Sequence, residues 1–153
     1  MVDMTDPTAR TLVLVRHAKA ESGKEGADHE RRLTSAGRTA ASEAGRWMAS
    51  VVPAIDAVWC SSAIRAVQTW AAIAPAVEAP EPTVGRDLYH AGPSDVTERL
   101  SGSAGTTVVV GHNPTVEQVL GSLTGQLRGM RPGAVAVVDL EAGRLLDFWE
   151  PPR

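Results

Sequence analysis

The sequence predicts a three-layer α/β sandwich, in which a central, mostly parallel sheet carries helices on both faces. Two runs of apolar and β-branched residues, TLVLV at 11–15 and TTVVV at 106–110, are typical of strands buried on both faces of such a sheet. Segments with apolar residues at helical spacing follow these runs, and strands that alternate with helices indicate this architecture. The 153 residues have the length of one domain, so we expect a single domain over 11–150 after a loose leader, 1–10.

The remaining elements follow from the same signals, taken in chain order. The expected strands lie at 11–15, 55–60, near 84, 106–110, 133–140 and 144–149. The expected helices lie at 36–51, 64–73, 94–100 and 114–123. Thr34 and Ser94 are expected to cap two of these helices, because their hydroxyls accept N–H groups of the first turn. Asn113 and Pro114 are expected to cap and begin the last helix, and 141–143 to form a tight turn.

Composition and charge exclude several classes of protein. Hydrophobic residues make up 43% of the chain and charged residues 22%, which excludes disordered and collagen-like chains. The net charge is −3, from 15 basic and 18 acidic residues, so no overall positive field attracts nucleic acid or an anionic membrane. A single cysteine forms no internal disulfide, and no signal-like or long apolar segment begins the chain. We therefore expect a cytoplasmic protein with neither a nucleic acid nor a membrane as partner.

Basic side chains follow three of the expected strands at the point where each strand ends. Arg16 and His17 follow the first strand. Arg65 lies one turn beyond the second, and His112 follows the strand at 106–110. Because ligands of parallel sheets bind beyond the carboxyl ends of the strands, we expect these side chains to lie together. Two arginines and two histidines favour dense negative charge, and the guanidinium matches phosphoryl oxygens, so the sequence predicts a phosphate site.

Three other chemistries fit these residues less well. A metal site would need carboxylates at ligand spacing or an HExxH motif, and two neighbouring arginines would repel a cation, so we expect no metal or other cofactor. Cys60 and Arg65 form CxxxxR, one residue shorter than the loop of cysteine phosphatases, so Cys60 is expected to be a buried, apolar-like side chain. The segment GSAG at 102–105 lacks the Lys-Ser/Thr of a P-loop and is expected to be a turn.

Three motifs, in this order, carry a resemblance to a known family. They are VRHAKAE at 15–21, SSAIRAVQT at 61–69 and VVGHNP at 109–114. This set resembles the histidine phosphatase superfamily, and specifically its short branch of SixA-like phosphohistidine phosphatases. DHERRLTSAG at 28–37 and LYHAG at 88–92 are similar to further elements of that branch, and the resemblance covers about residues 11–150. Ala18 stands where many members have glycine, which argues against the longer, mutase-like members.

The resemblance implies a phosphoglycerate mutase-like fold and a phosphoryl transfer that uses no metal and passes through a phosphohistidine intermediate. By position in the motifs, His17 would be the nucleophile, and Arg16 and Arg65 would bind phosphoryl oxygens. His112 would be the second histidine of the pocket. We expect one ring nitrogen of His17 to be unprotonated and the other to be held as N–H by a backbone carbonyl. His112, preferably charged, and the arginines would stabilise the negative charge of the transition state.

A proton donor for the leaving group is less clearly indicated. Glu21, Asp28 and His90 lie in or near the motif loops and are candidates for a donor or accessory role, although such residues are also common as solvated loop residues. A phosphomonoester needs a donor, because it leaves as an alkoxide. A phosphoramidate such as phosphohistidine leaves as a nitrogen base that can be protonated beforehand. The weak donor signal therefore favours a phosphoramidate substrate.

Other residues near the motifs are candidates for contacts with the substrate. Ser61 and Asn113 are candidate substrate-binding residues, and both could instead cap a helix. Arg31 or Arg32 could help to select an anionic substrate, or could lie in solvent.

The leading hypothesis is a metal-independent phosphatase that uses His17 to remove the phosphoryl group from a phosphohistidine of a protein. One alternative is a phosphatase of a small phosphorylated metabolite, such as a sugar phosphate or a nucleotide. Another is a non-catalytic module that binds phosphate or a phosphoprotein. Turnover of a phosphodonor separates the two enzymes from the binding module.

Overall fold

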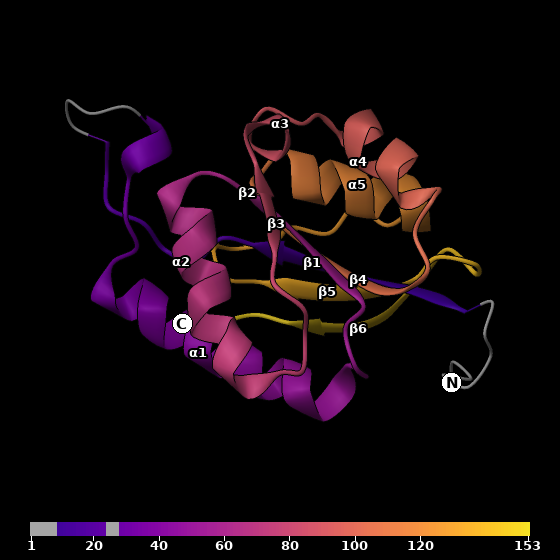
Figure 1. The fold of residues 1–153 in the computed structure, drawn as a ribbon, viewed down its shortest axis with the longest axis horizontal. Coiled ribbons are helices and arrows are strands. Elements are labelled where there is room, and N and C mark those ends of the chain that lie inside the picture. Colours follow the sequence, from indigo (N-terminus) through magenta and orange to yellow (C-terminus); the bar gives the residue numbers. More distant parts are fainter. Residues whose placement is uncertain (1–8, 24–27) are drawn as a thin grey trace.

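The computed structural model describes residues 9–23 and 28–153, in which one mixed sheet carries helices on both faces (Figure 1). The strands are β1 (Arg10–Arg16), β2 (Ala57–Ser61), β3 (Thr83–Gly85), β4 (Gly105–Gly111), β5 (Val135–Asp139) and β6 (Arg144–Trp149). The helices are α1 (Ser35–Val51), α2 (Ile64–Ile73), α3 (Arg86–Tyr89), α4 (Pro93–Leu100) and α5 (Thr115–Thr124), with short 3-10 helices η1 (Asp28–Glu30) and η2 (Ala74–Ala76). Within these described residues, no helix is long and apolar enough to cross a membrane. Most of the leader expected at 1–10 lies outside the described residues, and Arg10 already belongs to β1.

The sheet has the strand order β3-β2-β4-β1-β5-β6. The neighbours from β3 to β1 pair in parallel, whereas β5 pairs antiparallel with both β1 and β6. Arg16 lies opposite Gly111 in the register of β1 and β4, so these two central strands end side by side. The predicted α/β sandwich with a mostly parallel sheet is confirmed.

Helices α1 and α2 cover one face of the sheet, and α4 and α5 cover the other (Figure 1). Val13 and Val15 of β1 pack with the first pair of helices, whereas Leu12 and Leu14 pack with the second pair. These side chains are fully buried, and each burial stabilises the fold by roughly 2 kcal/mol. Burial on both faces is the reason why this strand is apolar without alternation.

The start of α1 agrees with the prediction, whereas the start of α4 does not. Thr34 caps α1, and its hydroxyl accepts a backbone N–H of the first turn at 3.0 Å. The prediction that Ser94 caps the next long helix is wrong, because α4 already begins at Pro93. Gly92 is the N-cap, and the Asp95 carboxylate accepts its N–H at 2.8 Å. Proline suits the first helical position, since the N–H it lacks would have no partner there.

The start of α5 differs from the prediction by one position. Pro114 lies at the N-cap and Thr115 is the first helical residue. Asn113 still contributes to the cap, because its side-chain oxygen accepts the backbone N–H of Glu117 at 3.3 Å. The predicted turn at 141–143 joins β5 to β6 and contains Gly143 with a φ of +61°, which glycine adopts without strain.

Candidate active site

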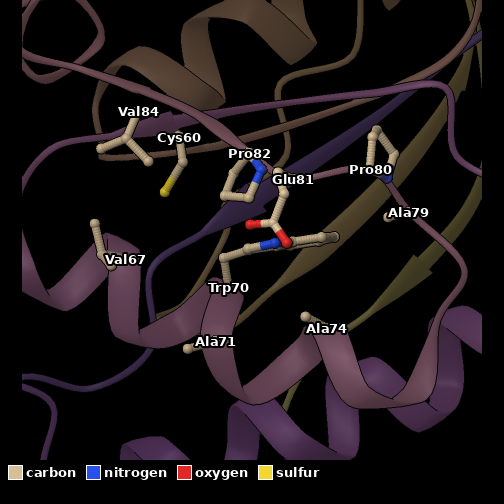
Figure 2. A pocket seen from close by; sticks show the side chains of 10 residues that line it. All are labelled: Cys60, Val67, Trp70, Ala71, Ala74, Ala79, Pro80, Glu81, Pro82 and Val84. Atoms are coloured by element: carbon tan, nitrogen blue, oxygen red, sulfur yellow. The ribbon is translucent and has the colours of Figure 1, made fainter.

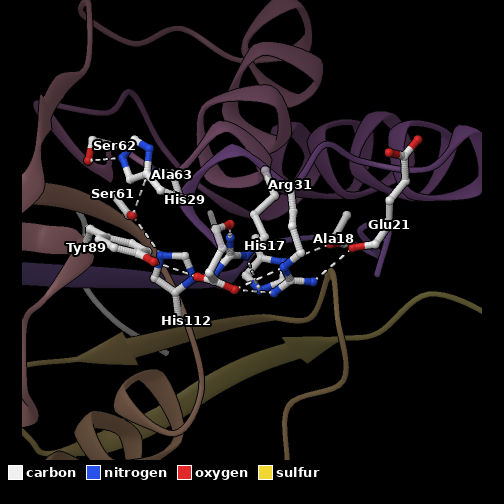
Figure 3. A network of polar contacts seen from close by, with 12 residues as sticks. His17, Ala18, Glu21, His29, Arg31, Ser61, Ser62, Ala63, Tyr89 and His112 are labelled. Atoms are coloured by element: carbon white, nitrogen blue, oxygen red, sulfur yellow. Dashed lines mark hydrogen bonds and ion pairs between the residues drawn. The ribbon is translucent and has the colours of Figure 1, made fainter. Parts of the chain in front are cut away.

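The ends of β1 and β4 place two histidines side by side. His17 follows β1 and donates its backbone N–H to the carbonyl of Gly111 at 3.0 Å, and His112 follows β4. The centroids of the two imidazole rings are 5.2 Å apart (Figure 3). Arg65 lies in the first turn of α2, which follows β2, the other neighbour of β4. The parallel strands therefore bring together side chains from three distant segments of the chain.

Arg65 connects the two histidines. Its Nε donates to Nε2 of His17 at 3.4 Å, and its Nη2 donates to Nδ1 of His112 at 3.3 Å. The same guanidinium donates from Nη1 to the backbone oxygen of Asp28 at 2.7 Å and from Nη2 to the carboxylate of Asp28 at 2.9 Å. The side chain of Arg65 is only 5% exposed, and a buried guanidinium requires such partners because an unpaired buried charge is costly.

His17 has one protonated and one unprotonated ring nitrogen. Its Nδ1 lies 2.8 Å from the backbone oxygen of Ala18, and because a carbonyl only accepts hydrogen bonds, Nδ1 carries the proton. Nε2 then keeps its electron pair, which accepts the N–H of Arg65. Burial is the main cause that lowers the pKa of His17 to about 4, and the charges of Arg65 and Arg16 act in the same direction. The ring is therefore neutral at pH 7, as a histidine nucleophile requires.

His112 is also neutral, so the expectation of a charged ring is wrong. Burial, together with the neighbouring His17 and Arg65, lowers its pKa to about 3. Because Arg65 can only donate, Nδ1 of His112 accepts, and its protonated Nε2 donates to Oγ of Ser61 at 2.7 Å. The motifs indicate that arginines are near this ring, but they do not indicate how deeply the ring is buried.

The depressed pKa values make the stability of the fold sensitive to mild acid. In the unfolded chain, His17 and His112 regain the ordinary pKa of about 6.5 and take up protons below it. In the folded chain both rings stay neutral down to about pH 4. We therefore expect the free energy of unfolding to be fully present above about pH 6.5 and to fall by about 3 kcal/mol for each ring, roughly 6 kcal/mol for the two, as the pH decreases to 4. Urea unfolding followed by circular dichroism between pH 7.5 and pH 4 measures this change.

The double variant His17→Asn/His112→Asn is the control for this prediction. It removes both buried rings, so its stability should vary less over the same pH range. Asp28 makes the stability depend on pH only in a more acidic range, because its hydrogen bonds hold the pKa of its carboxyl well below the usual value. An equal pH dependence in the wild type and in the double variant would show that other groups cause it.

Comparisons with known proteins identify the family. Residues 12–88 match the model of the histidine phosphatase superfamily, branch 1. The chain belongs to this superfamily. A protein of Mycobacterium tuberculosis, named as uncharacterised, is 41% identical over 117 residues, which are 72% of each chain. A protein of Mycobacterium leprae, also named as uncharacterised, is 39% identical over 118 residues, which are 72% of this chain and 71% of that one.

Solved structures with the same fold include three SixA-type proteins. The protein from Nakamurella multipartitia, described as a candidate phosphohistidine phosphatase, is 31% identical with a TM-score of 0.82, over 97% of this chain and 100% of that one. The protein from Agrobacterium tumefaciens, described in the same way, is 28% identical with a TM-score of 0.83, over 95% of this chain and 99% of that one. A protein histidine phosphatase SixA complexed with tungstate is 21% identical with a TM-score of 0.77, over 92% of this chain and 97% of that one. The resemblance of the motifs is confirmed, and the chain is a phosphatase of this superfamily.

A cavity of about 610 Å³ includes both histidines of this histidine phosphatase in its wall. Its lining residues are Arg16, His17, Lys19, Ala20, Asp28, Arg31, Arg65, Tyr89, His90, His112, Asn113 and Pro132. Glu21, one of the candidate proton donors, does not line it. The Glu21 side chain is exposed and its carboxylate points away from His17 (Figure 3), so Glu21 is not placed to protonate a leaving group. His90 does line the cavity and is exposed, so it remains a candidate donor.

Asp28 lines the cavity but has no proton to donate. Tyr89 donates to its Oδ2 at 2.6 Å, Arg65 donates to the same oxygen at 2.9 Å, and Nε of Arg31 donates to Oδ1 at 3.0 Å. These hydrogen bonds, that of Tyr89 first, hold the pKa of the carboxyl well below its usual range. Since a carboxylate that stays ionised is not a general acid, the donor role considered for Asp28 is wrong.

The side chains of Ser61 and Asn113 both form hydrogen bonds within the protein. Ser61 is fully buried, accepts the N–H of His112, and is not among the residues that line the cavity. Asn113 does line the cavity, but its amide nitrogen donates to the Glu117 carboxylate at 2.5 Å and to the backbone oxygen of Met130 at 3.0 Å. Both residues therefore support the site, because Ser61 does not reach the cavity and both side-chain N–H groups of Asn113 already have partners.

Tyr89 is a site residue that the sequence interpretation missed. Its ring meets the ring of His112 edge-on with the centroids 5.6 Å apart, and its hydroxyl bonds to Asp28. The element LYHAG contained the signal, since its tyrosine is the residue that reaches the site. Of the two arginines considered for substrate choice, Arg31 lines the cavity, whereas Arg32 is exposed and does not.

Cys60 is buried, as predicted, and is not part of the site. Burial raises the pKa of its thiol to about 12, so the sulfur is not a nucleophile at neutral pH. It lines a separate cavity of about 280 Å³, together with Val67 and Trp70 of α2 and with residues 79–82 and 84 (Figure 2). Within residues 9–23 and 28–153, no three His, Cys, Asp or Glu side chains are grouped so that they could hold a metal ion.

Proposed function

We propose that this chain is a metal-independent phosphohistidine phosphatase of phosphorylated proteins, with a phosphoryl intermediate on Nε2 of His17. The observation that carries the proposal is the state of that ring. Ala18 holds Nδ1 as N–H, and the low pKa keeps Nε2 unprotonated at neutral pH. Similarity to SixA-type proteins described as candidate phosphohistidine phosphatases supports the choice of substrate.

Arg16 and Arg65 would bind the phosphoryl oxygens, and His112 would bind one with its Nε2–H in place of Ser61. Arg16 donates from Nη1 to the backbone oxygen of Met130 at 2.8 Å, but its Nε is buried with no partner among the described atoms. An unpaired buried N–H costs about 1–3 kcal/mol, and a phosphoryl oxygen would satisfy it. Two guanidinium groups and the N–H groups around them suit the dispersed negative charge of a metaphosphate-like transition state.

Transfer from phosphohistidine to His17 exchanges one imidazole for another. The P–N bond of the substrate breaks and its electron pair goes to the leaving nitrogen, while a new P–N bond forms to Nε2 of His17. If the second nitrogen of the substrate ring is already protonated, a neutral imidazole leaves and His17 keeps its Nδ1 proton. No general acid is then required, which agrees with the ionised state of Asp28, the one carboxylate among the described residues that line the cavity.

Hydrolysis of the intermediate restores the enzyme. Water attacks the phosphorus, the bond to Nε2 of His17 breaks, and its electron pair returns to the ring. Phosphate leaves with the oxygen and both protons of the water, and His17 is again neutral with a proton on Nδ1. The environment that lowers the pKa of His17 favours the neutral ring and therefore its departure.

A phosphatase of small phosphate esters is the second candidate function. An alcohol leaving group requires a proton donor. Among the donors considered from the sequence, His90 is exposed and lines the cavity, which supports this candidate.

Hydrolysis assays in EDTA test the proposal. We expect release of phosphate from a peptide that carries phosphohistidine and poor hydrolysis of sugar phosphates and nucleotides. Brief incubation with labelled phosphohistidine donor, followed by quenching, should trap phosphate on the protein that is labile to acid and stable to alkali. Preference for esters, lost in His90→Ala, would favour the second candidate, and absence of all turnover would favour a phosphate-binding module.

A further inference from the structure

Asp28 contacts Arg65 from the exposed side of the cavity. The Asp28 side chain is 52% exposed, whereas that of Arg65 is 5% exposed. No other carboxylate lines this cavity in the part of the chain that the structure describes. A phosphohistidine is attached to its protein through the imidazole, so the leaving ring lies toward solvent when the phosphoryl group reaches His17. The carboxylate is therefore on the side from which the leaving group enters.

Hydrogen-bond donors fill both acceptor positions of Oδ2 in the Asp28 carboxylate. Its Oδ2 accepts from the Tyr89 hydroxyl at 2.6 Å and from Nη2 of Arg65 at 2.9 Å. Its Oδ1 accepts from Nε of Arg31 at 3.0 Å and forms an ion pair with Nη2 of Arg31 at 2.9 Å. Each carboxylate oxygen has about two lone-pair positions, so a new donor to Oδ2 must replace Tyr89 or Arg65. A phosphoryl oxygen bound to Nη2 of Arg65 would compete with Oδ2 and leave one acceptor position free beside the phosphoryl group.

We propose that Asp28 makes the site selective for nitrogen-linked phosphoryl groups, because its carboxylate accepts the N–H of the leaving base. This inference rests on the proposed function. Substrate binding replaces the bond between Arg65 and Oδ2 with a bond between Arg65 and a phosphoryl oxygen, and the N–H of the leaving imidazole then bonds to Oδ2. Asp28 thus contacts the substrate in addition to supporting Arg65.

The bonds and protons balance in this arrangement. Asp28 stabilises the protonated substrate ring, whose proton is on the nitrogen that is not bonded to phosphorus. When the P–N bond breaks, its electron pair neutralises the ring, which leaves with that proton, and the bond from phosphorus to Nε2 of His17 forms. Asp28 neither gains nor loses a proton. The bridging oxygen of a phosphate ester carries no N–H, and its lone pairs are repelled by the carboxylate.

A comparison of two substrates tests the role of Asp28. The measured quantity is the ratio of kcat/KM for a phosphohistidine peptide to kcat/KM for p-nitrophenyl phosphate, whose leaving group departs without a proton. In Asp28→Asn we expect this ratio to fall by about tenfold or more, the effect of losing a hydrogen bond to a charged group. The pH above which peptide hydrolysis declines should also decrease, since the bound substrate ring loses its proton more readily.

Tyr89→Phe is the matched control, because it removes one donor to the same carboxylate and keeps the negative charge. In this variant the ratio should stay constant or rise. An equal loss of activity toward both substrates in Asp28→Asn would mean that Asp28 only positions Arg65, and it would overturn the inference. The inference is also wrong if Tyr89→Phe lowers the ratio as much as Asp28→Asn does.

Failure of the proposed function gives a different result from failure of this inference. Wild-type protein that hydrolyses p-nitrophenyl phosphate but not the phosphohistidine peptide overturns both. Wild-type protein that hydrolyses the peptide, with the same substrate ratio in Asp28→Asn, overturns only the role of Asp28.

Discussion

Replacing His17 with alanine is expected to lower phosphohistidine hydrolysis by a factor of about 10⁴ or more and to abolish the trapped phosphate. Its Nε2 is unprotonated at neutral pH, and the other candidate nucleophile is less suited to attack. The thiol of Cys60 is protonated at neutral pH and lines a different cavity. Steady-state assays and rapid quenching with a labelled donor measure the two effects.

His112→Ala is the matched variant for this prediction. Removal of a group that stabilises the transition state is expected to lower the rate by about 10²–10³, while the phosphorylated intermediate still forms on His17. Both variants should keep the circular dichroism spectrum of the wild type. Label that persists in His17→Ala and disappears in His112→Ala would contradict the assignment and exchange the roles of the two histidines.

The position of the site was predictable because the ends of strands determine it. In a parallel sheet, residues that follow neighbouring strands share one edge, so Arg16, His17 and His112 could be placed together from the apolar runs before them. Those runs were informative because the strand is buried on both faces: Leu14 packs with one pair of helices and Val15 with the other. The cap at the start of α1 was also predictable, because the Thr34 hydroxyl accepts the N–H of Gly37, only three positions further along the chain.

Ionisation and long-range contacts were not predictable in this way. The neutral state of His112 depends on how deeply the ring is buried, which is a property of the packed structure. The hydrogen bond from Tyr89 to Asp28 joins residues 61 positions apart, and Tyr89 ends a helix of four residues, too short to show helical periodicity. From the sequence, Asp28 was therefore a candidate general acid. In the structure, the hydrogen-bond donors that surround its carboxylate keep it ionised, so it acts as an acceptor.

Arg65→Ala is expected to lower kcat/KM by about 10³, and Arg65→Lys by about 10². The guanidinium donates to His17, His112 and Asp28 from three nitrogens at once. The ammonium of a lysine carries the same charge, but it is a point charge and cannot reproduce this planar arrangement of donors. Steady-state kinetics on the phosphohistidine peptide measure both losses, and recovery of nearly full activity by lysine would show that only the charge is needed.

The two variants of Arg65 should also differ in their pH dependence. The charge of Arg65 lowers the pKa of His17 and of His112, and its side chain helps to exclude water from both rings. In Arg65→Ala both effects are lost, so the pKa of His17 rises, and the acid limb of kcat/KM moves from near pH 4 toward about 6.5. Lysine keeps the charge, so the limb should stay close to its wild-type position. An acid limb that does not move in Arg65→Ala would mean that burial by the rest of the fold alone keeps His17 unprotonated.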